Sequence, residues 1–116
     1  MIPDKVKIGG ITYSVEVTED EIYDRGRLLE GLISYSKGTI KLDKEMQDEY
    51  LERTFLHEVL HGIFESLGMY EDGEPKIDEI TANAISNALY QVLKDNDISF
   101  RQEYAGGEII PVKEVL

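Results

Sequence analysis

Near its start the chain alternates between apolar and polar positions with a period of two, which is the pattern of half-buried strands. Apolar residues occupy alternate positions over 6–17, on either side of Gly9-Gly10. A two-residue glycine link between alternating runs predicts a β-hairpin. A second pair of short strands is expected within 32–42, and the charged segment 18–30 between the two pairs predicts a loop.

From residue 44 onward the apolar positions follow the period of an amphipathic helix. The first helix is expected over 44–67, with Asp43 as its N-cap and Gly68 as the residue that ends it. A second helix is expected over 76–94, with Pro75 at its start. Small side chains along one face of this second helix allow another helix to approach closely.

Together these elements predict one α+β domain over 1–116, in which a small, mostly antiparallel sheet packs on two long helices. A chain of 116 residues has the size of a single domain. For the tail, 98–116, two alternatives stay open: a late edge strand or a mobile segment. The apolar run 109–112 also suits a substrate mimic lying in a groove, although packing or fraying is favoured.

The composition excludes several classes of protein. The chain has 24 acidic and 12 basic residues, a net charge of −12. This balance disfavours binding to nucleic acids or to anionic membranes, both of which need clustered Lys and Arg. The absence of cysteine excludes disulfides, thiol nucleophiles and cysteine-ligated zinc. With no bilayer-spanning apolar run and no signal-peptide pattern at Met1–Lys5, we expect a cytoplasmic protein; the sequence does not indicate its oligomeric state.

Both histidines of the chain lie in one motif, His57-Glu58-Val59-Leu60-His61. Residues four apart on a helix share a face, so the two imidazoles can bind one Zn²⁺. Glu58 is rotated away from that face, yet its side chain is long enough to reach a water held by the metal and act as general base. The alternative is a histidine pair without a ligand on a helix flank. It is disfavoured because unpartnered imidazoles inside an apolar stripe would cost free energy.

A catalytic zinc site takes three protein ligands and a water. Since the chain has no cysteine and no third histidine, the third ligand must be a carboxylate. Glu79 is the preferred candidate, because an antiparallel return of the second helix brings it level with the motif. An ordinary first-turn glutamate, stabilised by the helix dipole, is the alternative interpretation of Glu79. Asp78 and Glu65 stay open as other third ligands.

Metallopeptidases usually stabilise the oxyanion with His, Tyr or Arg, and the chain offers only weak candidates for this role. These candidates are Tyr70, Tyr90, Arg101 and Tyr104.

Two further features have two interpretations each. Gly62 either makes room for a neighbouring element or is a tolerated packing glycine. The strand at 38–42 is either a structural edge or an edge that binds an extended peptide.

The two histidines with Glu58 and Glu79 resemble the gluzincin clan of zinc metallopeptidases, whose pattern is HExxH followed by a glutamate on a later helix. The small size and the order of strands, motif helix and glutamate helix resemble the minigluzincins. The segment 79–83 is similar to the E-x-x-A-N stretch of phage and bacterial metallopeptidases of the ImmA/IrrE type. This resemblance, over 38–95, implies a zincin-like fold and peptide-bond hydrolysis, often of a regulatory protein or of the chain itself.

The sequence therefore predicts a small zinc-dependent metallopeptidase, with a phage or prophage origin implied by the resemblance. One Zn²⁺ is held by His57, His61 and Glu79, Glu58 is the general base, and the partner is a peptide or protein substrate. Two other hypotheses stay open: a zinc-binding regulatory module without catalysis, and a metal-free interaction domain.

Overall fold

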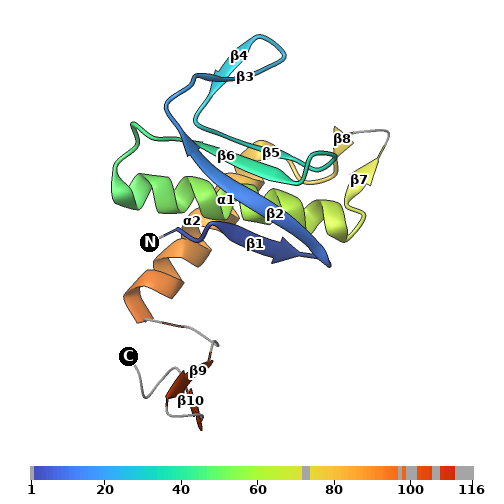
Figure 1. Ribbon diagram of the computed structural model, residues 1–116. Helices are drawn as coiled ribbons and strands as arrows, with labels where there is room; N and C mark the ends of the chain where they lie inside the picture. The colour runs from blue at the N-terminus through green and yellow to red at the C-terminus, as the bar shows by residue number, and fades with distance from the viewer. Residues whose placement is uncertain (1, 72–73, 97, 99–101, 106–107, 112–116) are drawn as a thin grey trace.

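The computed structural model describes residues 2–71, 74–96, 98, 102–105 and 108–111. It shows an α+β arrangement with one small sheet and two helices, as predicted (Figure 1). The main sheet has the strand order β1-β2-β6-β5. Its strands are β1 (Lys5–Ile8), β2 (Ile11–Thr18), β6 (Thr39–Asp43) and β5 (Gly31–Ser34).

The sheet is mixed. Strands β1 and β2 form the expected antiparallel hairpin, and Gly9 and Gly10 have φ angles of 57° and 85° in its two-residue turn. Such positive angles fit a type I′ turn, which glycine adopts without strain. Strands β5 and β6 are also antiparallel, but β2 and β6 are parallel. In the strand order, β6 lies inside the sheet, and β1 and β5 form its two edges. The expectation of an edge strand at 38–42 is therefore wrong, and the edge next to β6 is β5.

The segment 18–30 is not the irregular loop that its charges predict. It contains a short hairpin of β3 (Ile22–Asp24) and β4 (Arg27–Leu29). Arg25 and Gly26, with φ angles of 52° and 78°, form its turn. Ile22 is buried and anchors the hairpin, and this single core residue was hidden among the charged ones.

Helix α1 spans Asp48–Ser66 and begins four residues later than predicted. Asp43 ends strand β6 and accepts a hydrogen bond from the Glu45 N–H, whereas Gln47 holds the N-cap position. The predicted end is confirmed: Gly68 has a φ of 71°. The N–H groups of Gly68 and Met69 donate to the carbonyls of Glu65 and Phe64, which is the pattern of a Schellman motif.

Helix α2 spans Glu79–Asn96, later at both ends than predicted. Pro75 lies in β8 (Glu74–Pro75), which pairs with β7 (Tyr70–Glu71), and does not start the helix. The N-cap is Asp78, whose Oδ1 accepts a hydrogen bond from the Thr81 N–H at 2.7 Å. This bond satisfies an N–H of the first turn that has no partner within the helix.

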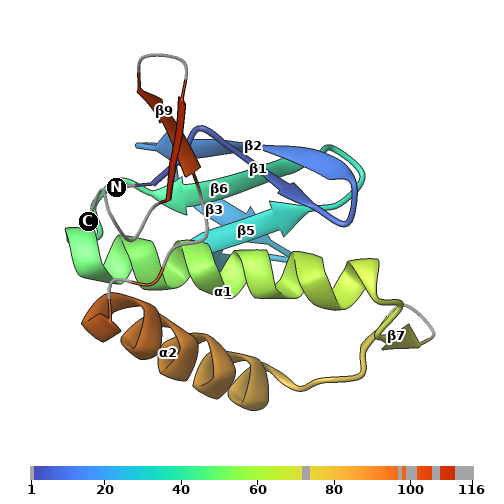
Figure 2. The same ribbon diagram turned by 90° about the horizontal axis from the view of Figure 1, so that it is seen from below.

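The molecule has three layers: the sheet, α1 and α2 (Figure 2). The sheet packs on α1 through a core of Ile8, Tyr13, Ile33, Ile40 and Leu42. A second cluster, Leu60, Phe64 and Ala82, joins α1 to α2. The prediction that the sheet packs on both helices is wrong for α2. Helix α1 lies between the sheet and α2 and contacts both through its wide apolar surface. On α2, Ile85 and Leu89 are partly exposed.

Gly62 lies where α1 meets the sheet. A Cβ atom at this position would come within 2.8 Å of Ile8 Cδ1 and 3.1 Å of Ile33 Cδ1. The glycine therefore makes room for β1 and β5, which supports the first of its two interpretations.

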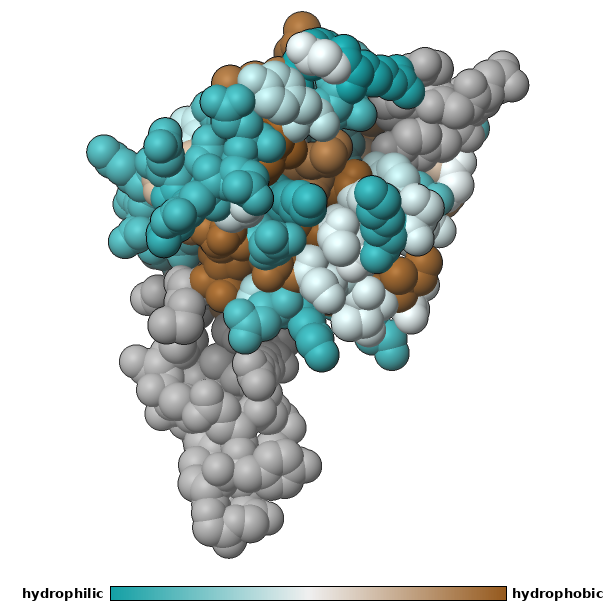
Figure 3. Space-filling model, turned by 45° about the horizontal axis from the view of Figure 1, so that its top comes forward, coloured by the Kyte–Doolittle hydropathy of each residue, from teal (hydrophilic) through white to brown (hydrophobic). Residues whose placement is uncertain are grey.

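In the tail, β9 (Gln102–Ala105) and β10 (Glu108–Pro111) pair with each other as a separate two-stranded sheet. They are not an edge of the main sheet, and Figure 1 shows them beyond the C-terminal end of α2. The prediction that 109–112 lies in a groove as a substrate mimic depends on side chains outside the described part of the chain. In the described parts of the chain, no helix is both long and apolar enough to cross a membrane. Apolar side chains nevertheless reach the surface among the charged ones (Figure 3).

Candidate metal centre and cleft

The packing of α2 on α1 brings His57, His61 and Glu79 together. His57 and His61 lie one turn apart on α1, and their Nε2 atoms are 3.0 Å apart. Glu79, the first residue of α2, places Oε1 2.6 Å from His57 Nε2 and Oε2 3.2 Å from His61 Nε2. Within the described residues, these three side chains form a group whose donor atoms lie close enough to hold one metal ion.

The donor set fits zinc. A tetrahedral ion with Zn–N distances of about 2.0–2.1 Å holds its donor atoms about 3.3 Å apart. The separations of 2.6, 3.0 and 3.2 Å among the three side chains are near this value. Two imidazoles and one carboxylate, with a fourth position left open, are typical of catalytic rather than structural zinc sites.

The second nitrogen of His57 has its own partner. His57 Nδ1 lies 3.4 Å from the buried Ser86 Oγ, and that hydroxyl donates to the Asn83 carbonyl at 3.0 Å. Since its proton is used there, Ser86 Oγ can accept from Nδ1–H of His57. With a metal ion bound, Nδ1–H would point to Ser86 and Nε2 would be the ligating nitrogen of His57.

His61 is also suited to ligation. Burial lowers the pKa of His61, although the charge of Glu79 opposes this shift. The neutral imidazole is therefore favoured, and only that form binds a metal ion.

Glu58 lies beside the cluster without belonging to it. Its side chain is only 7% exposed. Burial raises the pKa of Glu58 to about 7, the charge of Glu79 acts in the same direction, and a hydrogen bond from the Ile33 N–H opposes them. The backbone of the edge strand β5 thus stabilises the charged form of Glu58.

The other predicted ligands do not join the group. Asp78 is the N-cap of α2, and Glu65 lies outside the cluster of three. Of the oxyanion candidates, Tyr90 donates its hydroxyl to Glu52 at 2.8 Å. The side chains of Tyr70 and Tyr104, and the whole of Arg101, are outside the described part of the chain.

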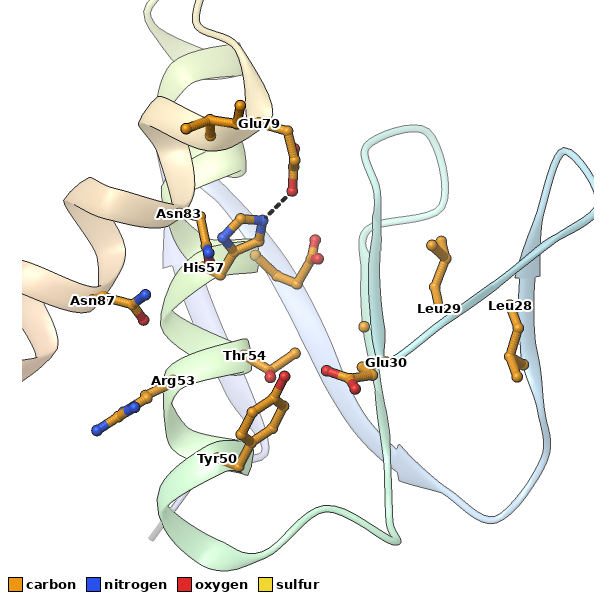
Figure 4. Close-up of a pocket in the computed structure, with 13 residues that line it drawn as sticks. Leu28, Leu29, Glu30, Tyr50, Arg53, Thr54, His57, Glu79, Asn83 and Asn87 are labelled. Atoms are coloured by element: carbon orange, nitrogen blue, oxygen red, sulfur yellow. Dashed lines mark hydrogen bonds and ion pairs between the residues drawn. The ribbon is translucent and has the colours of Figure 1, made fainter.

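A cleft of about 620 Å³ opens beside the cluster, and His57, Glu58 and Glu79 are part of its wall. On one side α2 contributes Ile80, Asn83 and Asn87, and on the other the link from β4 to β5 contributes residues 28–31 (Figure 4). Tyr50, Arg53 and Thr54 lie along α1 between these walls. The nearby carboxylate of Glu30 raises the pKa of Tyr50.

Sequence reasoning missed these cleft residues. Tyr50, Arg53 and Thr54 precede His57 by seven, four and three positions. Helical periodicity alone could have placed them on the face of the motif. The signal for Leu28 and Leu29 was weaker, since it depended on recognising the hairpin around Arg25-Gly26.

Comparisons of this chain with known protein families, with curated proteins and with solved structures found no match. Its function must therefore be argued from the geometry of the cluster and of the cleft beside it.

Proposed function

We propose that the protein is a small zinc-dependent metallopeptidase. The observation that carries the proposal is the convergence of His57, His61 and Glu79 on one point, with Glu58 buried next to them. The resemblance of these four residues to the gluzincin pattern supports the same conclusion. Zn²⁺ held by the three side chains would polarise a peptide carbonyl and make a water more acidic.

The residues of the chain have distinct roles in this proposal. His57 and His61 present neutral nitrogens, oriented in the case of His57 by Ser86. Glu58 takes a proton from the attacking water and passes it to the amine that leaves when the peptide bond breaks. The Ile33 N–H favours the charged form of Glu58, which is the form that accepts the proton.

A peptide can reach the site along the cleft. Strand β5 is one of the two edge strands of the main sheet and also forms part of the cleft through Gly31. An edge strand can pair with an extended chain through its backbone. The strand that would bind an extended peptide is therefore β5, residues 31–34, and not the segment 38–42 considered from the sequence.

The proposal is tested by metal analysis and a single substitution. Protein purified without a histidine tag should contain one zinc per chain and lose stability when a chelator is added. The zinc-loaded protein should cleave members of a peptide library. Glu58→Gln should keep the zinc and abolish cleavage, whereas the matched change Glu65→Gln on the same helix should leave both unchanged.

Two outcomes point elsewhere. A protein that holds zinc through the three ligands and cleaves nothing is a regulatory zinc module. This second candidate is supported by Tyr90, the one oxyanion candidate with a described side chain, because its hydroxyl is engaged with Glu52. A protein that takes up no zinc at all would contradict both metal-dependent functions and leave a metal-free interaction domain.

A further inference from the structure

Arg53 lies one helical turn before His57 and is part of the wall of the same cleft. It is the only Lys or Arg among the described residues that form this wall. The wall also contains the carboxylates of Glu30, Glu58 and Glu79.

No carboxylate of the described residues neutralises Arg53. The ion pairs Lys44–Glu19 and Lys94–Glu52, and those of Glu79 with the two histidines, do not include Arg53. The neighbouring Glu52 accepts hydrogen bonds from the Tyr90 hydroxyl and from Lys94. The guanidinium of Arg53 thus keeps its donors for another group.

The position of Arg53 is fixed by helix α2. Its guanidinium carbon lies 5.3 Å from the centre of the Tyr90 ring, within range of a cation–π interaction. Figure 4 shows the guanidinium on the side of α1 that faces Asn87. Asn83 and Asn87 follow Glu79 at successive turns of α2 and add side-chain amides to this wall. Amide and guanidinium N–H groups are the donors that a carboxylate requires.

We infer that Arg53, flanked by Asn83 and Asn87, is a binding site for a carboxylate of the peptide substrate. This inference rests on the proposed function and names its substrate class: peptides with a negative charge close to the cleaved bond. Elsewhere in the cleft, Glu30 and Glu58 repel such a group, so the carboxylate is directed to the Arg53 end. Its source is either the C-terminus of the peptide or an acidic side chain.

The helix sets the distance between the two sites. Four residues of α-helix correspond to a rise of about 6 Å, and an extended peptide advances about 3.3–3.6 Å per residue. The recognised carboxylate therefore belongs to a residue within about one to three positions of the cleaved bond. Since Arg can bind a carboxylate with two parallel hydrogen bonds and Lys cannot, Arg53→Lys should not substitute fully for Arg53.

The inference is tested by binding to zinc-loaded Glu58→Gln protein, which holds peptides without cleaving them. The probes are acetyl-Leu-Leu with a free carboxylate, its amide, and the amides of acetyl-Leu-Glu and acetyl-Leu-Gln. Affinities come from NMR titration, with the Arg53 side-chain N–H resonance as a direct reporter. We expect the free acid or the Glu peptide to bind at least about tenfold more tightly than its neutral counterpart, as expected for a charge-assisted pair.

Variants separate this site from the metal, which also attracts carboxylates. Arg53→Gln should remove the preference for the charged probe, and Arg53→Lys should restore only part of it. Arg25→Gln removes the same charge at the tip of the β3–β4 turn, outside the cleft, and should leave the preference intact. Equal binding of charged and neutral probes, or an unchanged preference in Arg53→Gln, would overturn the inference. Tighter binding of the free acid would identify the C-terminus of the peptide as the source of the carboxylate, and tighter binding of the Glu peptide would identify an acidic side chain.

Failure of this inference and failure of the proposed function have different signatures. Cleavage of the peptide library without any charge preference that depends on Arg53 refutes the carboxylate site alone. An Arg53-dependent preference in a protein that cleaves nothing refutes the peptidase alone. Absence of both cleavage and preference refutes both.

Discussion

At the scale of single residues, Glu79 has two favourable roles at one position. As the first residue of α2, its carboxylate lies at the positive end of the helix dipole. The same carboxylate bridges His57 and His61, although most of the Glu79 side chain is exposed. The dipole explains why an acid is stable here without a metal, so only a measurement of metal binding separates the two roles.

Replacing Glu79 should therefore weaken zinc binding. Glu79→Gln keeps the shape of the side chain and removes its charge. We expect the affinity to fall by at least about 100-fold, since even the loss of an outer-shell partner of a zinc ligand costs about 10- to 100-fold. Competition with a chromophoric chelator measures it. Glu65→Gln is the matched control, and a larger loss in that variant would show that Glu65 is the true third ligand.

At the scale of secondary-structure elements, the contact of β5 with α1 holds the cleft together. Gly31 begins β5, and a Cβ atom on it would lie 2.8 Å from Thr54 Cγ2 and 3.3 Å from Glu58 Cγ. The missing side chain allows the edge strand to lie directly on the helix beside Glu58. Because the Ile33 N–H of β5 also lowers the pKa of Glu58, the packing of this strand and the charge of the carboxylate are coupled.

This close approach predicts that Gly31→Ala destabilises the protein by roughly 1–3 kcal/mol, the usual cost of overpacking. Thr54→Ala removes the methyl group that the new Cβ would meet. In the double variant, Gly31→Ala should therefore cost much less than in the wild type. Urea unfolding of the four proteins gives this coupling energy. Additive effects would mean that the two positions do not meet.

Helix α2 depends on its first turn in a similar way. The pKa of Asp78 is lowered, chiefly by the hydrogen bond from the Thr81 backbone N–H. A carboxylate with a lowered pKa in the folded state contributes stability above its unfolded pKa and loses it as the pH falls through the folded value. The Asp78 cap should thus stabilise the protein at neutral pH and fail in acid.

Asp78→Ala should consequently lower the urea midpoint at about pH 7, and the difference from wild type should narrow at about pH 3. Asp78→Asn keeps an acceptor for the cap and should lose less than Asp78→Ala at neutral pH. A chelator in all samples removes any contribution from bound metal. A deficit in Asp78→Ala that is independent of pH would show that the charge of Asp78 does not stabilise the cap.

At the scale of the whole molecule, local pattern predicted more than long-range pairing. The Gly9-Gly10 hairpin, the two helices and the His57–His61 pair follow from spacings within a few turns or positions, whereas Glu79 was placed by the antiparallel return of α2 after a short connection. The parallel pairing of β2 with β6 joins segments more than twenty residues apart, and no local signal encodes it. The cleft wall opposite α2 was missed because the local pattern there is weak. It contains Leu28 and Leu29, which belong to a hairpin with one buried anchor, Ile22.

The layered arrangement makes the proposed metal a link between α1 and α2. Leu60 and Phe64 on α1 and Ala82 on α2 form the buried contact between these helices, so α2 rests on a small core. A metal bound by His57, His61 and Glu79 would tie the start of α2 to the middle of α1. Because it binds only the folded protein, its binding free energy adds to the stability of that contact.

Zinc should therefore stabilise the whole fold and α2 above all. At a free concentration about 1,000 times the dissociation constant, one bound ion adds about 4 kcal/mol. Thermal unfolding with zinc and with chelator measures this gain, and hydrogen exchange should show that the amides of α2 gain the most protection. Glu58→Gln should keep the gain, because Glu58 is not a ligand in this proposal, whereas His57→Ala with His61→Ala should lose it. An equal gain in the double histidine variant would mean that zinc stabilises the protein from another site.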